Sequence, residues 1–241
     1  MLPTIWIPLV AHLQCRFPDV SMVLFDRYVS EIHDVCLNTK HWIWIGHSLG
    51  FMQLWADPKL KEALHRMPVA AVSVQGFTHL PEMSSNGSLS KGNARKLGRD
   101  LGLIPEQALT YFYRSVGLDK QQIKQHLARF NQGKMLAVLR AELSFMQEAD
   151  ISEALRQRLR GSRIALLALS ANRDRIVRRQ LTEASFATHL SSVSGQDMRE
   201  MQYPARVIVK QVNSSSHCLP LSQPAWCAEV IGDFIDGLSV F

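Results

Sequence analysis

The sequence predicts an α/β fold, in which a mostly parallel sheet is flanked by helices and carries an inserted helical lid. Short apolar segments rich in β-forming residues alternate with helical segments over residues 1–80 and again over 161–241, and this alternation is typical of parallel sheets. Residues 81–160 show helical periodicity without a strand pattern. We therefore expect a core formed by 1–80 and 161–241 and a lid formed by 81–160.

The elements of the core follow from periodicity and from turn-forming residues. Strands are expected at 22–25, 42–45, 69–74, 164–169 and 205–209. Helices are expected at 6–17, 29–35, 49–55, 60–66, 179–186 and 226–235. The lid is expected to open with a Ser/Asn/Gly-rich loop at 84–92 and to continue as amphipathic helices, whose apolar residues should pack onto the sheet or roof a pocket: Phe112, Tyr113, Phe130, Leu139, Leu143, Phe145 and Met146.

Composition excludes several classes of protein. With 46% hydrophobic and 20% charged residues, the chain is an ordinary globular protein and not a disordered one. The net charge of +6 favours acidic partners, but the basic residues lack the patterns of nucleic-acid binders, so no nucleic-acid partner is expected. No apolar run reaches the roughly 18 to 20 residues of a membrane span, and the first residues lack the basic start of a secretory signal. We expect a cytoplasmic monomer.

The cysteines are not expected to form disulfides or a metal site. They are scattered along the chain without the paired spacing of a zinc site, and a cytoplasmic protein keeps its thiols reduced. The four are Cys15, Cys36, Cys218 and Cys227.

The segment Gly46-His47-Ser48-Leu49-Gly50 lies between a predicted strand and a predicted helix. A Gly-x-Ser-x-Gly pattern in this context is a nucleophile elbow, which holds a serine in a sharp exposed turn. We expect both glycines to be required because a side chain at either position would collide with the tight turn. Ser48 is the predicted nucleophile, and His47 is expected to be a packing or loop residue.

A serine nucleophile needs a histidine base that is held by a carboxylate. With an elbow of this kind, the acid and then the histidine should follow the serine, each after a late strand. Asp174 and His217 fit this order and these positions. Asp26 also ends a predicted strand and is a rival acid, although it precedes the serine. Cys218, beside the histidine, is expected to be a buried small hydrophobe.

Acyl transfer also requires two donors for the oxyanion, and the amide of Leu49 is expected to be one of them. The second donor normally comes from a His-Gly-type loop after an earlier strand, and no such loop is found. Either the first strands are missing from this chain, or the fold is shortened, or residues 1–5 substitute for the loop.

Together these residues resemble the α/β-hydrolase superfamily. Within it, the chain is similar to the small bacterial esterases that include the pimeloyl-[acyl-carrier protein] methyl ester esterases of biotin synthesis. The resemblance is carried by the elbow at 46–50, by the acid loop at 171–177 and by the histidine loop at 217–224. It implies an α/β-hydrolase fold and a serine esterase that needs no metal or cofactor. The sequence departs from this family in its missing oxyanion loop and in the short link from Asp26 to the elbow, so its N-terminal strands are expected to be shortened or missing.

The resemblance also implies that basic lid residues dock an acidic carrier protein. The candidates are Arg114, Arg129, Arg140, Arg156 and Arg160, together with Lys120, Lys124 and Arg158. The expected substrate is a carboxylic ester, either a small molecule or bound to acyl-carrier protein. Two alternatives stay open. One is a lyase or carbon–carbon hydrolase that uses the same triad on a small carboxylate, and the other is a non-catalytic binding protein on a degenerate hydrolase scaffold.

Overall fold

The computed structural model describes residues 3–24, 39, 41–56, 68–83, 88–128, 130, 132–161, 164–191 and 207–238. Its sheet has four parallel strands in the order β1-β2-β3-β4. They are β1 (Ile43–His47), β2 (Ala70–Val74), β3 (Ala165–Ala171) and β4 (Val207–Val212). The strand order follows the chain order, so successive crossovers add one strand after another to the same side of the sheet.

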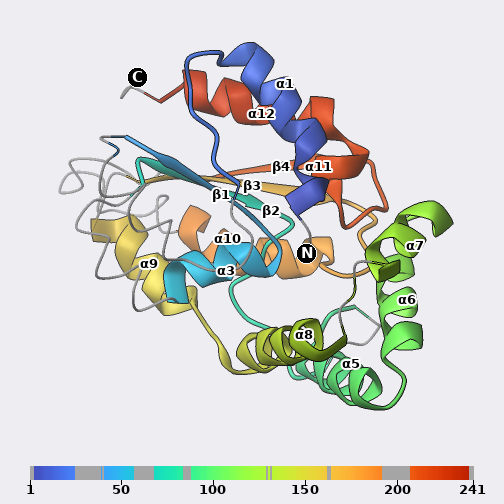
Figure 1. Ribbon diagram of the computed structural model, residues 1–241. Coiled ribbons are helices and arrows are strands. Elements are labelled where there is room, and N and C mark those ends of the chain that lie inside the picture. The colour runs from blue at the N-terminus through green and yellow to red at the C-terminus, as the bar shows by residue number, and fades with distance from the viewer. Residues whose placement is uncertain are drawn as a thin grey trace.

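Helices cover both faces of this sheet (Figure 1). The N-terminal part gives the short 3₁₀ helix η1 (Pro3–Ile5), α1 (Ile7–Arg16) and α3 (Leu49–Ala56). The segment between β2 and β3 gives α5 (Lys91–Leu103), α6 (Pro105–Ser115), α7 (Lys120–Ala128), α8 (Gln132–Glu148) and α9 (Ser152–Gly161). The C-terminal part gives α10 (Arg179–Ser191), α11 (Leu219–Ser222) and α12 (Pro224–Asp236).

The alternation of side chains along each strand divides the core into two layers. Val72 of β2 and Leu167 of β3 pack with α1 and α12 on one face. Ala71 and Leu166, one residue earlier on each strand, join the layer on the opposite face, where α3, α9 and α10 lie (Figure 1). Every residue of β2 and β3 is buried, which explains why both strands are nearly continuous apolar runs, each interrupted by one serine, Ser73 or Ser170.

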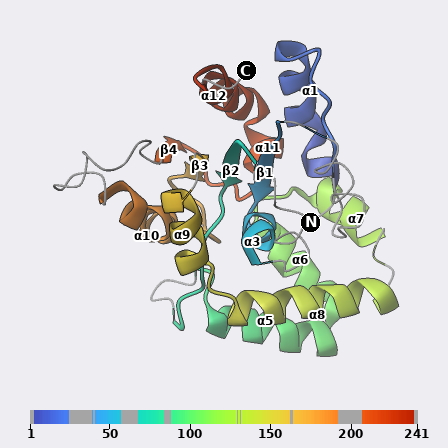
Figure 2. The ribbon, with the colours of Figure 1, turned by 90° about the vertical axis from the view of Figure 1, so that its left-hand side faces the viewer.

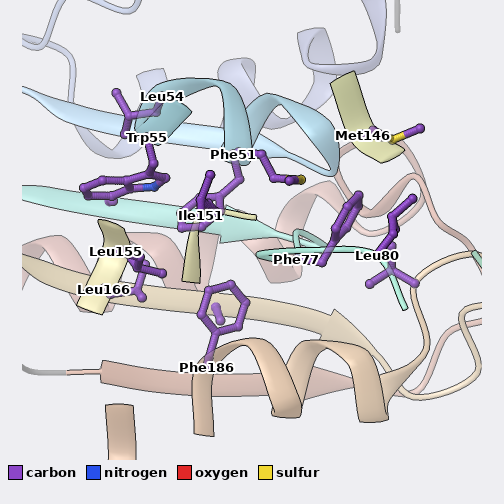
Figure 3. Close-up of a cluster of buried hydrophobic side chains, with 14 of the residues drawn as sticks. Phe51, Leu54, Trp55, Phe77, Leu80, Met146, Ile151, Leu155, Leu166 and Phe186 are labelled. Carbon is purple, nitrogen blue, oxygen red and sulfur yellow. The ribbon is translucent and has the colours of Figure 1, made fainter. Parts of the chain in front are cut away.

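Large side chains from distant parts of the chain fill the second layer (Figure 3). Phe51 of α3 and Phe186 of α10 meet edge to face, with ring centroids 5.6 Å apart. Leu155 of α9 belongs to the same cluster and is fully buried. This packing fixes α3, which begins directly after Ser48, against the sheet.

Helices α5 to α8 form a separate group beyond that layer (Figure 2). In both views α5 and α8 lie side by side, and α6 contacts both α5 and α7. Ser90 caps the start of α5, because its hydroxyl accepts the amide of Asn93 at 3.2 Å. Since α9 packs against α3, it lies with the core layer. The division of the chain at residues 80 and 160 stays a prediction.

The strand predicted at 22–25 is wrong. Residues 21–24 form no strand, and the side chains of Val23 and Leu24 are 50% and 41% exposed. An apolar run records β propensity only, and a strand also requires a neighbour to pair with and a face to bury. Four strands are therefore present in the described ranges where five were expected. Phe25, Asp26 and the helices expected at 29–35 and 60–66 lie outside the described residues, as does the start of the strand expected at 205–209.

The remaining predicted elements are present with shifted ends. β3 and β4 run two and three residues further than expected, to Ala171 and Val212, and α5 begins at Lys91, inside the loop predicted at 84–92. The parallel arrangement is confirmed for all four strands. Within the described ranges, no helix combines the length and the apolarity needed to cross a bilayer.

Candidate active site

Each of the four strands is followed by a polar residue that belongs to one cluster at the carboxyl edge of the sheet. Ser48 follows β1, Gln75 follows β2, Asp174 lies three residues beyond β3, and His217 lies five residues beyond β4. Backbone hydrogen bonds continue past the strand ends, since the Ser48 amide donates to the Val74 carbonyl at 2.9 Å. In open parallel sheets this edge is where ligands bind.

Ser48 occupies a strained turn between β1 and α3. Its φ of 52° lies in the left-handed region, which side chains rarely adopt. A Cβ atom at Gly46 would lie 2.7 Å from both the Cα and the backbone nitrogen of Phe51, so only glycine fits there. The predicted requirement for Gly50 is wrong, because a Cβ at that position meets no atom within 4 Å. Gly50 is the second residue of α3 and its Cβ would point into open space.

Ser48, His217 and Asp174 form a hydrogen-bonded relay. His217 Nε2 lies 3.1 Å from Ser48 Oγ, and His217 Nδ1 lies 2.7 Å from Asp174 Oδ2. Because a carboxylate only accepts hydrogen bonds, Nδ1 carries the ring hydrogen and Nε2 presents its lone pair to the serine hydroxyl. Asp174 and His217 are both buried. This arrangement can remove the serine proton as the hydroxyl attacks an electrophile.

The backbone of the acid loop holds the second oxygen of the carboxylate. Asp174 Oδ1 accepts the amides of Ile176 at 2.7 Å and Val177 at 3.2 Å. Together with the bond to His217, these contacts fix the plane of the carboxylate.

His47 supports the histidine loop from β1. Its Nε2 lies 2.6 Å from the carbonyl oxygen of His217, and since that oxygen only accepts, Nε2 carries the hydrogen. Burial, and then the nearby charge of His217, lower the pKa of His47 from 6.5 to about 3. A neutral, hydrogen-bonded His47 agrees with the packing role predicted for it.

The lid also contacts the histidine loop. The amide of His217 donates to the Val116 carbonyl at 3.0 Å. Cys218 is buried in a small cluster with Val116, Leu118 and Ile123. Burial, and then the charge of Asp174, raise the pKa of Cys218 to about 12, so this thiol stays protonated as expected of a packing residue.

The oxyanion donors remain predictions. Leu49 is the first residue of α3, and the first amides of a helix have no acceptor within the helix, so this amide is suited to the role. Ile5 is buried, and the ring of Trp6 lies edge-on to His47 with centroids 6.3 Å apart. The N-terminal segment thus packs beside the elbow. Met1 and Leu2 lie outside the described residues.

The basic lid candidates are only partly brought together. Three of the basic side chains, Arg114, Lys120 and Lys124, line a groove of about 490 Å³ between α6 and α7. Arg156 forms an ion pair with Glu153 instead, and Arg140 lies on α8. Arg129 and the side chains of Arg158 and Arg160 are outside the described part of the chain. Over the same described part, no cluster of His, Cys, Asp or Glu could hold a metal ion.

Gln75 was not among the site residues predicted from the sequence. Its side chain contacts both Asp174 and the histidine loop. The sequence offered one signal for Gln75, because it is a polar residue directly after a buried strand, at the sheet edge where Ser48 was expected. The rival acid Asp26 lies outside the described residues.

Comparisons with known proteins identify the fold. No protein-family model matches the chain, and no curated protein matches its sequence. Solved structures do match. A hydrolase from Oleispira antarctica is 10% identical with a TM-score of 0.69, over 98% of this chain and 87% of that one. An esterase from Exiguobacterium antarcticum is 11% identical with a TM-score of 0.65, over 95% and 87%.

A thermophilic esterase from Thermogutta terrifontis is 13% identical with a TM-score of 0.60, over 98% of this chain and 86% of that one. At such low identity these matches speak to architecture alone. The parallel sheet, the helices on both of its faces and these matches together show that the chain adopts the α/β-hydrolase fold.

Proposed function

We propose that the protein is a serine hydrolase that cleaves carboxylic esters through an acyl-enzyme. The observation that carries the proposal is the relay of Ser48, His217 and Asp174, with its distances of 3.1 Å and 2.7 Å. The strained φ of Ser48 supports it, because non-glycine residues in this backbone region cluster at functional sites.

The geometry suits a two-step reaction. Ser48 Oγ forms a bond to the ester carbonyl carbon as its proton passes to His217 Nε2, and the Leu49 amide donates to the oxygen that becomes negative. The carbon–alkoxy bond then breaks, and the proton on Nε2 moves to the departing alcohol. In the second step water attacks the acyl carbon and gives a proton to His217 Nε2. The bond from that carbon to Ser48 Oγ then breaks, the proton on Nε2 returns to Oγ, and the acid is released. Asp174 holds the ring throughout.

Two kinds of comparison support an ester as the substrate. The structural neighbours from Exiguobacterium antarcticum and Thermogutta terrifontis are themselves esterases. The chain also resembles small bacterial esterases in the sequences of its elbow, acid loop and histidine loop.

The finer proposal is a methyl ester carried on acyl-carrier protein, as in biotin synthesis. The groove between α6 and α7 supports an acidic partner with an aliphatic chain, because its lining combines the basic side chains of Arg114, Lys120 and Lys124 with apolar residues such as Ile123 and Leu127. If the carrier is recognised, kcat/KM for pimeloyl-carrier methyl ester should far exceed that for free dimethyl pimelate. Equal values of kcat/KM would be consistent with a general esterase and would refute recognition of the carrier protein.

The first experiment combines an activity-based probe with ester hydrolysis. A fluorophosphonate should label Ser48, and p-nitrophenyl esters of two to twelve carbons should be cleaved with a chain-length optimum. Ser48→Ala should lose both signals while it keeps a cooperative melt. Ser144→Ala, which removes an exposed hydroxyl on α8, is the matched control and should keep both signals.

The remaining outcomes separate the alternatives. Labelling of Ser48 without hydrolysis of any ester would favour the lyase or carbon–carbon hydrolase. A folded wild type that is neither labelled nor active would favour the binding protein on a degenerate scaffold and would overturn the proposal.

A further inference from the structure

Gln75 adopts a backbone conformation that is unfavourable for glutamine. It follows β2 directly, its φ is 51°, and it is completely buried. Glycine or asparagine is the usual residue in this left-handed region. A long polar side chain kept there, in the protein interior, points to a role for that side chain.

The Gln75 amide makes a hydrogen bond through each of its polar atoms. Its Nε2 donates to Asp174 Oδ2 at 2.7 Å and to the carbonyl oxygen of Ser216 at 2.7 Å. Its Oε1 accepts the amide of Leu219 at 3.0 Å. Only one orientation of the amide is possible, because a flip would set its oxygen against two acceptors and its NH₂ against a donor.

These contacts join the acid to the loop that carries the base. Asp174 Oδ2 accepts both from Gln75 Nε2 and from His217 Nδ1. The contacts with Ser216 and Leu219 hold the chain on both sides of His217. One neutral side chain thereby sets the position of the carboxylate relative to the imidazole.

We propose that Gln75 is a positioning residue of the Ser48–His217–Asp174 relay, and that its amide holds Asp174 and the histidine loop at the spacing that proton transfer needs. The inference rests on the proposed function. It goes beyond the relay because it assigns a fourth side chain, from the end of β2, to the same chemistry.

Two variants separate the donor from the rest of the side chain. Gln75→Glu keeps the size and the acceptor for the Leu219 amide but replaces the NH₂ donor with an oxygen. Gln75→Met keeps the length and removes donor and acceptor together. Gln125→Glu, at an exposed position on α7, makes the same change of charge away from the site and is the matched control.

The expected result is a loss in kcat of about 100-fold for both variants, as for displacement of a reacting group by about 1 Å, with KM within about twofold of wild type. Gln75→Glu should also acquire a new pH dependence. At low pH the introduced carboxyl is protonated and can donate to Asp174. As pH rises it ionises and repels Asp174, so the ratio of its kcat to that of wild type should fall with rising pH.

A purely structural role would give a different pattern. The variants would melt at lower temperature, while kcat and the shape of the pH profile stayed those of wild type, and this outcome would overturn the proposal. If neither variant folds, NMR of the wild-type protein tests the proposal instead. The Gln75 side-chain amide protons should exchange slowly and show an NMR contact to the His217 Nδ1 proton. Rapid exchange without that contact would refute the role.

The two levels of proposal fail separately. A wild type that the fluorophosphonate labels, together with Gln75 variants of unchanged kcat, would refute the positioning role and leave the hydrolase intact. A wild type without labelling or turnover would refute the hydrolase, and the role of Gln75 with it.

Discussion

The two glycines of the elbow should respond to the same substitution in opposite ways. Gly46→Ala places a Cβ atom 2.7 Å from the Cα and nitrogen of Phe51 and 2.8 Å from Trp44 Nε1. Gly50→Ala places one where nothing lies within 4 Å. The pair changes one hydrogen to a methyl group at positions four residues apart, so each variant is the control for the other.

The magnitudes follow from these contacts. Non-bonded carbon atoms are optimally about 3.5–4.0 Å apart, so a methyl group at Gly46 overlaps the backbone of α3 by about 0.8 Å or more. Such overpacking costs about 1–3 kcal/mol. At Gly50, which lies in α3 with no positive φ, alanine should stabilise by up to about 1 kcal/mol through helix propensity. The two variants should differ by about 1–4 kcal/mol.

Urea unfolding at constant pH measures this difference. In a thermal melt the Gly46 variant should have a Tm lower than that of the Gly50 variant by about 2–16 °C, since 1 kcal/mol moves Tm by about 2–4 °C in a chain of this size. Gly46→Ala should also lose ester hydrolysis, because α3 can yield only by carrying Ser48 and the Leu49 amide with it. Gly50→Ala should keep its activity. Equal stabilities, or a Gly50 variant that is the weaker of the two, would refute the reasoning.

Two further predictions concern buried titratable groups. The pKa of His47 is about 3 in the folded protein and 6.5 ordinarily. Between these pH values only the unfolded chain binds a proton at His47. The free energy of unfolding should therefore fall as pH falls from 6.5 toward 3. The slope from this residue approaches about 1.4 kcal/mol per pH unit. His47→Gln can still donate to the His217 carbonyl and should remove that part of the slope. A wild-type urea midpoint that does not change between pH 6.5 and 3 would contradict the prediction. For the cysteines, iodoacetamide at pH 8 should modify exposed Cys15 well before Cys218 and Cys227, whose pKa values burial raises to about 12. Mass spectrometry over time gives the order, and early modification of Cys218 would refute its packing role.

All four strands of the sheet could be predicted from short apolar runs, and β2 and β3 are buried along their whole length. Apart from one serine in each, these two strands consist of apolar residues. The run at 22–25 is also apolar, but Val23 and Leu24 are about half exposed and belong to no strand. Pairing depends on which neighbour the sheet offers, and a single segment carries no information about that neighbour.

The proposed relay could be predicted because the fold imposes an order on it. A serine in an elbow, an acid after a later strand and a histidine after the last one could each be found along the sequence, and the structure brings Ser48, Asp174 and His217 within hydrogen-bonding distance. Gln75 could not be found in this way. Its role depends on the direction of a side chain in a left-handed backbone conformation, and neither is encoded in a local pattern.

The alternating faces of β2 and β3 bear on how far sequences of this fold can diverge. Each strand position requires only an apolar side chain of suitable volume, and cores tolerate many such exchanges. By contrast, Gly46 and Gln75 have requirements set by a close contact and by three hydrogen bonds. Drift can therefore replace most of the sheet while its shape persists, which accounts for a similar architecture at 10% identity to the hydrolase of Oleispira antarctica.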